Sequence, residues 1–252
     1  MVNIFLSGCN GKMGQVITRL AALDDEVKIA GGLDINTSIK NDYPVFTDLA
    51  NVNVRFDVIL DFSHPSVFDK ILEFALKTNK PLVMATTGLS SEQKMKLRDA
   101  GLKIPVLFSA NMSLGINLLV DLVKRAAKAL YGNFDIEIIE KHHSQKIDAP
   151  SGTALVLADE INSVIEQKCE YVYDRHSKRR KRNSNEIGIH AVRGGTIVGE
   201  HSVIFAGTDE IIEINHRATS KDIFGVGALR ASKFIYHMKP GFYSMNDMFN
   251  EL

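Results

Sequence analysis

The sequence has too few cysteines for a disulfide framework and no excess of charge of either sign. Among 252 residues only Cys9 and Cys169 are cysteines. A reduced, cytoplasmic setting is the simplest expectation for such a chain. The 30 basic residues equal the 30 acidic ones. The overall charge therefore gives no reason to expect nucleic acid or an anionic membrane as a partner.

Long hydrophobic runs are also missing. No apolar run approaches the ~18 residues that mark a membrane span. The N-terminus begins directly with a strand pattern, so we expect no secretory signal and no membrane association. What is present is the composition of an ordinary globular protein, 45% hydrophobic and 24% charged. A chain of 252 residues predicts one large domain or two moderate ones.

The first 34 residues carry a dinucleotide-binding pattern. A short apolar strand over residues 2–7 is followed by the glycine-rich segment 8–14 and then by a helical stripe. A second strand, over residues 27–33, ends in Asp34. In such a unit the glycine turn approaches a pyrophosphate and the acid accepts hydrogen bonds from a ribose. Asn10 stands where the commoner pattern has its second glycine, but Asn tolerates unusual backbone angles. A purely structural turn is the alternative.

The residue after Asp34 bears on the type of cofactor. A 2′-phosphate normally requires an arginine near this point, but Ile35 follows Asp34, and a carboxylate repels a phosphate. We therefore expect NADH to be used at least as well as NADPH. Lys12 and Lys40 are available cations, so use of NADPH is not excluded.

Strand and helix patterns continue to alternate as far as residue 113. The further strands are predicted over residues 56–62, 81–85 and 104–108. This alternation predicts an α/β fold, a Rossmann-type doubly wound parallel sheet. Ligands of such sheets bind beyond the carboxyl ends of the strands. The polar segments 86–88 and 109–113 follow two of these strands, so we expect them to line the nicotinamide half of the site.

After a long amphipathic helix over residues 114–131 the pattern changes. One helix, over residues 153–165, is accompanied by strands over residues 135–141, 187–193, 196–205 and 210–217. Turn residues Gly194-Gly195 and Gly207-Thr208-Asp209 predict hairpins between the last three strands. We interpret this as a second α+β domain with a mixed, largely antiparallel sheet. One face of such a sheet is left bare, which favours a homo-oligomer.

These patterns divide the chain into two predicted domains. Residues 1–113 and 231–252 are expected to form the dinucleotide-binding domain, and residues 114–230 the substrate-binding and oligomerisation domain. The basic run 178–182 lies between two strand patterns of the second domain. We interpret it as a solvated loop that helps to attract anionic ligands rather than as a nucleic-acid patch.

Residues 140–154, with the sequence EKHHSQKIDAPSGTA, carry the densest chemistry in the chain. Histidines such as His142 and His143 exchange protons near neutral pH, and Lys146 supplies a positive charge. The Ser151-Gly152-Thr153 helix start offers backbone N–H groups to an anion. The segment predicts a site for a small, multiply anionic substrate that needs a proton. The alternative is a solvated loop before an ordinary capped helix. We predict no metal site.

The same motifs occur, in the same order, in a known family, and the resemblance spans the whole chain. The sequence resembles the 4-hydroxy-tetrahydrodipicolinate reductases, also called dihydrodipicolinate reductases, of the diaminopimelate and lysine pathway. The segment 140–154 is the most specific part of the match. The other matching segments are residues 8–14, 61–63, 86–88, 111–117, 187–193 and 199–201.

The resemblance implies an enzyme that reduces a cyclic, unsaturated imine dicarboxylate, with hydride from a nicotinamide to ring C4, and that forms a homotetramer through the second sheet. It implies that His142 is the proton donor and acceptor and that Lys146 is a second proton donor. The implied contacts to the substrate are made by His143, Ser151, Gly152 and Thr153. The implied contacts to the cofactor are made by Gly8, Cys9, Asn10, Gly11, Lys12, Met13, Asp34, Ala85, Thr86, Thr87, Ser109, Ala110, Asn111 and Met112.

Some positions depart from better-known members. Ile35 puts tight NADPH binding in doubt, and Ser144 and Gln145 make the substrate site less positive. Because the two predicted binding regions lie in different domains, we also expect hinges, near residues 113–114 and 228–230.

Two other functions are compatible with part of the pattern. Another two-domain NAD(P)-dependent amino- or hydroxy-acid dehydrogenase would share the first domain, but it gives no reason for a Pro-Ser-Gly-Thr helix start beside two histidines. A non-enzymatic NADH-sensing regulator would need a DNA-binding module, and the sequence shows neither a basic domain nor an extra helix-turn-helix region.

Overall fold

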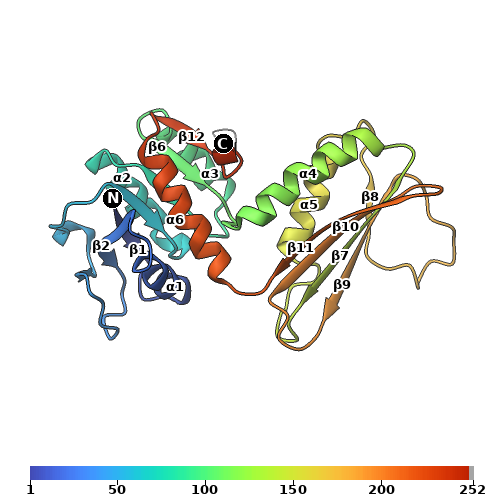
Figure 1. The fold of residues 1–252 in the computed structure, drawn as a ribbon. Coiled ribbons are helices and arrows are strands. Elements are labelled where there is room, and N and C mark those ends of the chain that lie inside the picture. Colours follow the sequence, from blue (N-terminus) through green and yellow to red (C-terminus); the bar gives the residue numbers. More distant parts are fainter. Residues whose placement is uncertain (250–252) are drawn as a thin grey trace. The chain divides into compact units, whose positions relative to one another are not determined.

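The structure is a computed structural model that describes residues 1–249, and its chain divides into two compact units (Figure 1). The first unit contains Met1–Leu114 and the chain from Asp222 onward, and the second contains Gly115–Lys221. Residues 250–252, which we assigned to the first domain, lie outside the described residues.

The second boundary differs from the predicted one. We placed it after residue 230, but that position lies inside the helix α6 (Asp222–Tyr236). The whole helix packs along α1 (Lys12–Ala21) and contacts strands of the first sheet. Ala228 and Leu229 are buried in the same core as Ile235. Residues 222–230 therefore belong to the first unit, and the hinge expected near residues 228–230 falls within a continuous helix.

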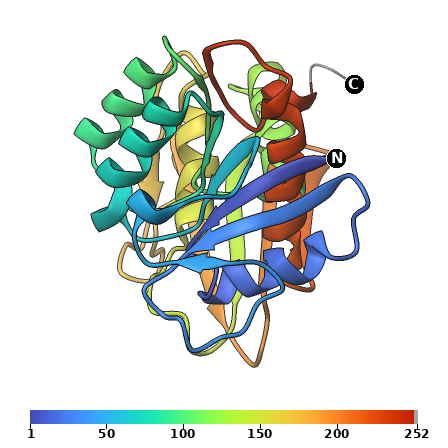
Figure 2. The same ribbon diagram turned by 90° about the vertical axis from the view of Figure 1, so that its left-hand side faces the viewer.

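The first unit is a parallel sheet with helices on both faces, as predicted. Its strand order is β12-β6-β5-β4-β1-β2-β3, and every adjacent pair is parallel. Figure 2 shows α1 and α6 on one side of the sheet and α2 and α3 on the other. The strands are β1 (Val2–Ser7), β2 (Val27–Leu33), β3 (Val45–Phe46), β4 (Val58–Asp61), β5 (Leu82–Met84), β6 (Pro105–Phe108) and β12 (Gly241–Tyr243). The other helices are α2 (Phe68–Thr78) and α3 (Ser91–Ala100), with 3-10 turns at Leu49–Asn51, Pro65–Val67 and Asp247–Phe249.

Burial on both faces explains why β1 is a continuous apolar run. Ile4 and Leu6 belong to the core beneath α1 and α6, whereas Phe5 belongs to the core on the α2 and α3 side. A strand that is covered on both faces needs apolar residues at successive positions. Ser90 and Gln93 form a capping box at the start of α3, with the two reciprocal hydrogen bonds of that motif.

The second unit is a mixed sheet with two helices. Its strand order is β11-β10-β7-β9-β8, in which β7 is antiparallel to β10 and parallel to β9. Buried residues of β7 such as Ile136 and Ile138 pack in one core with residues of both helices. The elements are α4 (Leu114–Leu130), β7 (Asp135–His142), α5 (Gly152–Asn162), β8 (Glu170–Val172), β9 (Glu186–Arg193), β10 (Gly199–Ala206) and β11 (Ile211–Ala218).

One of the two predicted hairpins is wrong. Residues 207–209 do join the antiparallel strands β10 and β11, but Gly194-Gly195 does not close a hairpin, because β7 lies between β9 and β10. The connection instead passes the end of β7, where the Gly194 N–H donates to the His142 carbonyl and the Ser144 N–H to the Gly195 carbonyl. A glycine pair specifies a change of direction, but strand partners are chosen by packing.

The basic run is not simply a solvated loop. Arg180 pairs with Glu186 at 2.6 Å, and Arg182 pairs with Asp135 at 2.6 Å and with Glu137 at 3.1 Å. These pairs neutralise part of the run. Buried carboxylates such as Glu186 require cationic partners, which is why these arginines fold back onto the sheet.

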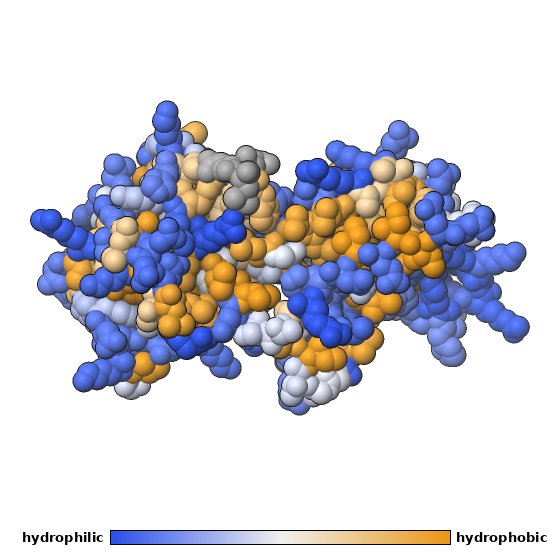
Figure 3. All heavy atoms as spheres, in the orientation of Figure 1, coloured by the Kyte–Doolittle hydropathy of each residue, from blue (hydrophilic) through white to orange (hydrophobic). Residues whose placement is uncertain are grey.

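The second unit also exposes apolar surface. In Figure 3, hydrophobic atoms gather along the line of α4, on which Leu118 is 46% and Leu122 41% exposed. Within residues 1–249, no helix is both long and apolar enough to cross a membrane.

Candidate functional site

The predicted catalytic histidine lies at the end of β7 and is held by a buried carboxylate. Nδ1 of His142 is 2.6 Å from Oε2 of Glu140, whose side chain is fully buried. Residues two apart on a strand point to the same face, so Glu140 and His142 both face the helices. The side chain of His142 is itself only 11% exposed, which leaves little water to compete for its hydrogen bonds.

Glu140 accepts hydrogen bonds from two other parts of the unit. Arg193, at the end of β9, donates to both of its carboxylate oxygens at 2.7 and 2.6 Å. The backbone N–H of Ser151, just before α5, donates to Oε1 at 2.9 Å. Burial alone would raise the pKa of Glu140, but these donors and His142 together hold the pKa below its ordinary value. Glu140 is therefore a charged acceptor at neutral pH.

The helix α5 begins beside this carboxylate. Ser151 is its N-cap, and the Ser151 hydroxyl accepts from the N–H of Ala154. Gly152 is the first helical residue, and a Cβ built on it would meet no atom within 4 Å. The space at the helix start is thus open, and it lies where a helix attracts anions. Thr153 follows in the first turn, so the predicted substrate residues Ser151, Gly152 and Thr153 stay together.

Lys146 lies in the loop between β7 and α5. Its Nζ is 2.6 Å from Oδ1 of Asp148, and this contact is the main cause that lowers the pKa of the Asp148 carboxyl. The Lys146 N–H donates to the carbonyl of His143, so the loop turns back on itself between the two residues. His143 and Lys146 are only partly buried. The segment therefore brings two imidazoles, an ammonium group and a helix start into one short loop.

His201, on β10, adds a second buried imidazole. Its ring centroid is 5.2 Å from that of His142 in an edge-to-face arrangement, and its Nε2 is 3.1 Å from the Ser151 hydroxyl. Burial, reinforced by the positive neighbourhood of His142, lowers the pKa of His201 to about 4. His201 is therefore neutral at physiological pH and supports the site without titrating there.

Glu140, Arg193 and His201 were not assigned roles from the sequence, although all three lie in matching segments. One signal was available for Glu140. The even-numbered positions of β7 face the core, and Ile136 and Ile138 occupy the two before it. A carboxylate on that apolar face needs a buried partner. The identity of the partner was not available, because Arg193 is 53 residues away.

The predicted cofactor residues of the first unit all follow β1, β2, β5 or β6 at the carboxyl edge of the sheet. Gly8 adopts φ +78°, and a Cβ there would lie 2.5 Å from the carbonyl oxygen of Phe62. A Cβ on Gly14 would lie 2.2 Å from the carbonyl oxygen of Gly8. Only glycine is thus tolerated at these two positions, the first in the turn after β1 and the second in the first turn of α1. Gly11, Lys12 and Met13 are exposed or partly exposed around the start of α1.

Asp34 and Asn10 connect this turn to the end of β2. Oδ2 of Asp34 accepts from the Asn10 N–H at 2.9 Å, and Oδ1 accepts from the Asn36 N–H at 2.9 Å. The Asn10 side chain donates to the Asn36 carbonyl and accepts from Asn41. Asn10 therefore does more than replace a glycine, because it braces the loop after β2. Each Asp34 oxygen keeps a second lone pair for a ribose hydroxyl.

The remaining predicted cofactor residues divide by exposure. Thr87, Ser109, Ala110 and Asn111 are exposed or partly exposed. The side chains of Cys9, Ala85, Thr86 and Met112 are buried, so these four residues can offer a ligand little more than backbone atoms. The hydroxyl of Thr86, for example, donates to Asp61 at 2.6 Å.

A cavity of about 960 Å³ opens at this edge, large enough for part of a dinucleotide. It is lined by Gly8, Gly11, Asp34, Ile35 and Ser63, among others. The glycine turn, the helix start and the strand-end acid thus meet at one hollow. These observations fit a pyridine dinucleotide.

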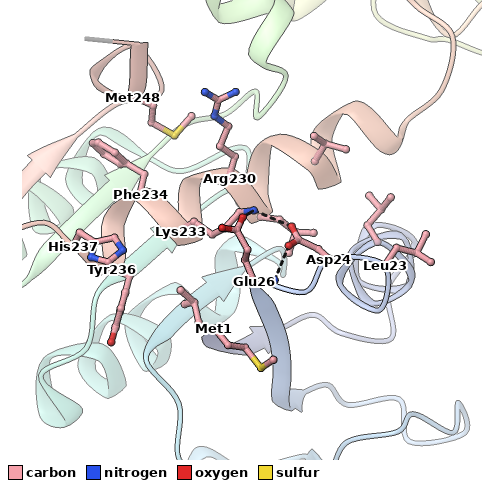
Figure 4. Close-up of a pocket in the computed structure, with 14 residues that line it drawn as sticks. Met1, Leu23, Asp24, Glu26, Arg230, Lys233, Phe234, Tyr236, His237 and Met248 are labelled. Carbon is pink, nitrogen blue, oxygen red and sulfur yellow. Dashed lines mark hydrogen bonds and ion pairs between the residues drawn. The ribbon is translucent and has the colours of Figure 1, made fainter. Parts of the chain in front are cut away.

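A second hollow, of about 870 Å³, lies at the opposite, amino end of β1 and β2 (Figure 4). Lys233 from α6 reaches across it and pairs with Asp24 at 2.9 Å and with Glu26 at 2.7 Å. Because the carboxyl edge is where parallel sheets bind ligands, the first hollow is the better cofactor site.

The fold, the hollow at the carboxyl edge of the first sheet and the His142 site of the second unit together define the class of protein. It is a Rossmann-type oxidoreductase with a separate α+β unit. Family models match nearly end to end: dihydrodipicolinate reductase, N-terminus, over residues 2–112, and dihydrodipicolinate reductase, C-terminus, over residues 115–249. The chain belongs to the dihydrodipicolinate reductase family.

Individual relatives agree with the family models. The chain is 53% identical over 248 residues to the 4-hydroxy-tetrahydrodipicolinate reductase of Caldanaerobacter subterraneus, covering 98% of both chains. It is 49% identical over 252 residues to that of Clostridium tetani, covering 99% of this chain and 98% of the other. The fold matches a solved structure, the dipicolinate-bound dihydrodipicolinate reductase of Paenisporosarcina sp. TG-14, with a TM-score of 0.82, 24% identity, and coverage of 98% and 99%.

Proposed function

We propose that this protein reduces 4-hydroxy-tetrahydrodipicolinate to tetrahydrodipicolinate with NADH or NADPH, in the diaminopimelate and lysine pathway. Membership of the family supports the reaction. The structural observation that carries the proposal is the buried carboxylate of Glu140, which holds both the His142 ring, at 2.6 Å, and the Ser151 N–H before α5, at 2.9 Å. Glu140 thereby holds the proton donor His142 close to the anion-binding start of α5.

The substrate is a ring with two carboxylates, and the second unit offers suitable partners for both. The open space at Gly152 and the first-turn amides of α5 suit one carboxylate. Lys146 and His143 supply positive charge and N–H donors for the ring and the other carboxylate. The solved relative from Paenisporosarcina carries dipicolinate, a compound of this kind.

Loss of the 4-hydroxyl as water leaves a conjugated imine, and the reduction then adds a hydride at its ring C4 and a proton. When bound, the reduced nicotinamide supplies the hydride. Negative charge then develops on the conjugated imine, and a nearby proton donor and cation stabilise it. In this proposal His142 delivers the proton from Nε2, the nitrogen that Glu140 does not engage. Lys146 assists as a second donor and as a fixed charge.

The first unit would bind the cofactor at its carboxyl edge through Gly8–Met13, Asp34, Ala85–Thr87 and Ser109–Met112. Asp34 suits the free ribose of NADH, and Ile35, which is 93% exposed, offers no charge to a 2′-phosphate. We therefore propose that NADH is used at least as well as NADPH. We also propose a cytoplasmic homotetramer, joined through the face of the second sheet that its helices leave uncovered.

A coupled assay tests the function. The preceding synthase generates the substrate in the cuvette, and oxidation of NADH or NADPH is followed by the absorbance of the reduced nicotinamide. His142→Gln and Lys146→Ala should each lower kcat by a factor on the order of 10² or more. Lys141→Ala is the matched control, since Lys141 lies on the other face of β7 and pairs with Glu200.

The outcomes are distinct. The proposal is supported if the wild type turns over the imine and the two site variants show the expected fall in kcat. Absence of turnover with both cofactors would overturn the reaction, and near-normal kcat in both variants would overturn the assigned roles.

A further inference from the structure

Glu140 contacts three groups of the site. It lies between the imidazole of His142, the guanidinium of Arg193 and the amide of Ser151. We propose that Glu140, held ionised by Arg193, is a positioning residue that fixes the tautomer and orientation of His142, so that Nε2 alone exchanges the catalytic proton. This inference rests on the proposed function insofar as His142 is the proton donor.

The tautomer follows from the hydrogen-bonding capacity of each group. An ionised carboxylate only accepts, so the 2.6 Å contact requires the proton of His142 to lie on Nδ1. In the neutral ring, Nε2 is then the acceptor. In the charged ring both nitrogens carry protons, and the Nε2–H bond is the one that breaks when its proton passes to the reduced substrate. The ring returns to the neutral Nδ1–H form, and Nε2 recovers a proton from solvent.

The surroundings of the ring also limit its rotation. The His201 ring lies edge-to-face at 5.2 Å. Gly199 lies beside the other nitrogen, where a Cβ would be 3.1 Å from Nε2. A ring flip about χ2 would exchange Nδ1 for carbon and lose the bond to Glu140. Holding one rotamer keeps the proton-donating nitrogen in a fixed place, which is the requirement for general acid catalysis.

Arg193 completes the arrangement. It donates to both oxygens of Glu140 and also to the backbone carbonyl of Asp148, at 2.7 Å. Its guanidinium thus joins the end of β9 to the loop that carries Lys146. The titratable groups in contact with the His142 ring are thus Glu140 and His201. Arg193 contacts Glu140 from the other side, and Lys146 is the cation of the adjoining loop. Among them only Glu140 provides an anion in contact with the ring.

The first test is spectroscopic and needs no substrate. Histidine-selective ¹⁵N labelling and two-bond ¹H–¹⁵N correlation spectra report which nitrogen of each imidazole carries the proton, and the His142→Gln spectrum assigns the His142 signals. We expect the Nδ1–H form for neutral His142 in the wild type. A wild-type spectrum with the proton on Nε2 would overturn the proposal, whatever reaction the protein catalyses.

The second test compares two carboxylates of the same strand. Glu140→Gln keeps the shape of the side chain but removes the charge and one acceptor. Glu137→Gln is the matched control, because Glu137 also pairs with two arginines and a histidine but lies on the opposite face of β7. In Glu140→Gln we expect the Nδ1–H preference to be lost. The control should keep it, even if both variants lose thermal stability.

Kinetics then separate positioning from folding. Glu140→Gln should lower kcat on the order of 10²-fold while KM changes much less, and its pH–kcat profile should move to lower pH because no anion stabilises the charged ring. Glu140→Asp keeps the charge and should recover part of kcat. An unchanged profile in a folded Glu140→Gln variant would overturn the proposal. Failure of the wild type to turn over the imine would instead overturn the proposed function.

Discussion

Gly199 lies directly against the ring of His142: a methyl group on Gly199 would be 3.1 Å from Nε2 and 3.5 Å from Cδ2. We predict that Gly199→Ala lowers kcat about tenfold or more, because the ring or the strand must shift by a few tenths of an ångström at the proton-donating nitrogen. Gly194→Ala is the control, since a Cβ there would meet no atom within 4 Å. Steady-state kinetics and thermal melting of the two variants make the comparison. Equal kcat for both would show that the contact is not restrictive.

Removal of Arg193 should destabilise the second unit strongly. Arg193→Met leaves the buried charge of Glu140 without its cation, and breaking one side of a buried ion pair costs about 3–5 kcal/mol. Urea unfolding at pH 7 measures this loss. The double variant Glu140→Gln/Arg193→Met should lose less than the sum of the single variants, because neither charge is then stranded. Arg217→Met removes a 70% exposed partner of Glu200 and should cost only about 0–1 kcal/mol.

Mild acid should destabilise the protein through His201. The pKa of His201 is lowered by burial to about 4, whereas the unfolded chain takes up a proton near pH 6.5. Between these values the unfolded state binds the proton and the folded state does not, so the free energy of unfolding falls as the pH falls. We expect a loss of about 1–2 kcal/mol from this residue between pH 6.5 and 5.

The pH dependence is measured by urea unfolding at each pH in wild type and in His201→Gln. The variant should show a shallower slope in this window. His176→Gln, in an exposed loop, should keep the wild-type slope. The carboxyl groups whose pKa values are lowered, including Glu140, lose their stabilising contribution only at lower pH, below about 4.5. An identical slope in wild type and His201→Gln would refute the prediction.

Asp34→Ala should weaken the binding of NADH more than the binding of NADPH. The carboxylate would accept hydrogen bonds from a free ribose but would repel a 2′-phosphate. Its loss also frees the N–H groups of Asn10 and Asn36, so some weakening of both cofactors is expected. The ratio of the two KM values is the informative quantity, with Asp42→Ala, an exposed carboxylate after the same strand, as control. An equal rise in both KM values would contradict the ribose contact.

Much of the fold could be predicted because it follows from local patterns. The run Val2–Ser7 and the glycines after it predicted a buried strand and a tight turn, and β1 and Gly8 have these properties. A strand was predicted over residues 135–141, and β7 covers them, with buried positions alternating with less buried ones. Period and turn chemistry act over a few residues, so they can be read without knowing the rest of the chain.

The errors lie where distant segments meet. Gly194-Gly195 was interpreted as a hairpin, but β7 is inserted between β9 and β10. The basic run was interpreted as solvated, but Arg182 reaches Asp135, 47 residues away. The boundary after residue 230 was wrong because α6 packs on α1, more than 200 residues earlier in the chain. None of these partners leaves a local signal.

The sequence by itself determined the family, the alternation of strands and helices, and the short segment that contains His142, Lys146 and the start of α5, because these depend on residue type and spacing. Only the tertiary structure decided that Glu140 holds His142 and that Arg193 and the Ser151 amide hold Glu140. A buried carboxylate requires donors, but sheet topology chooses which donors reach it. That choice depends on the packing of β7, β9 and α5 together.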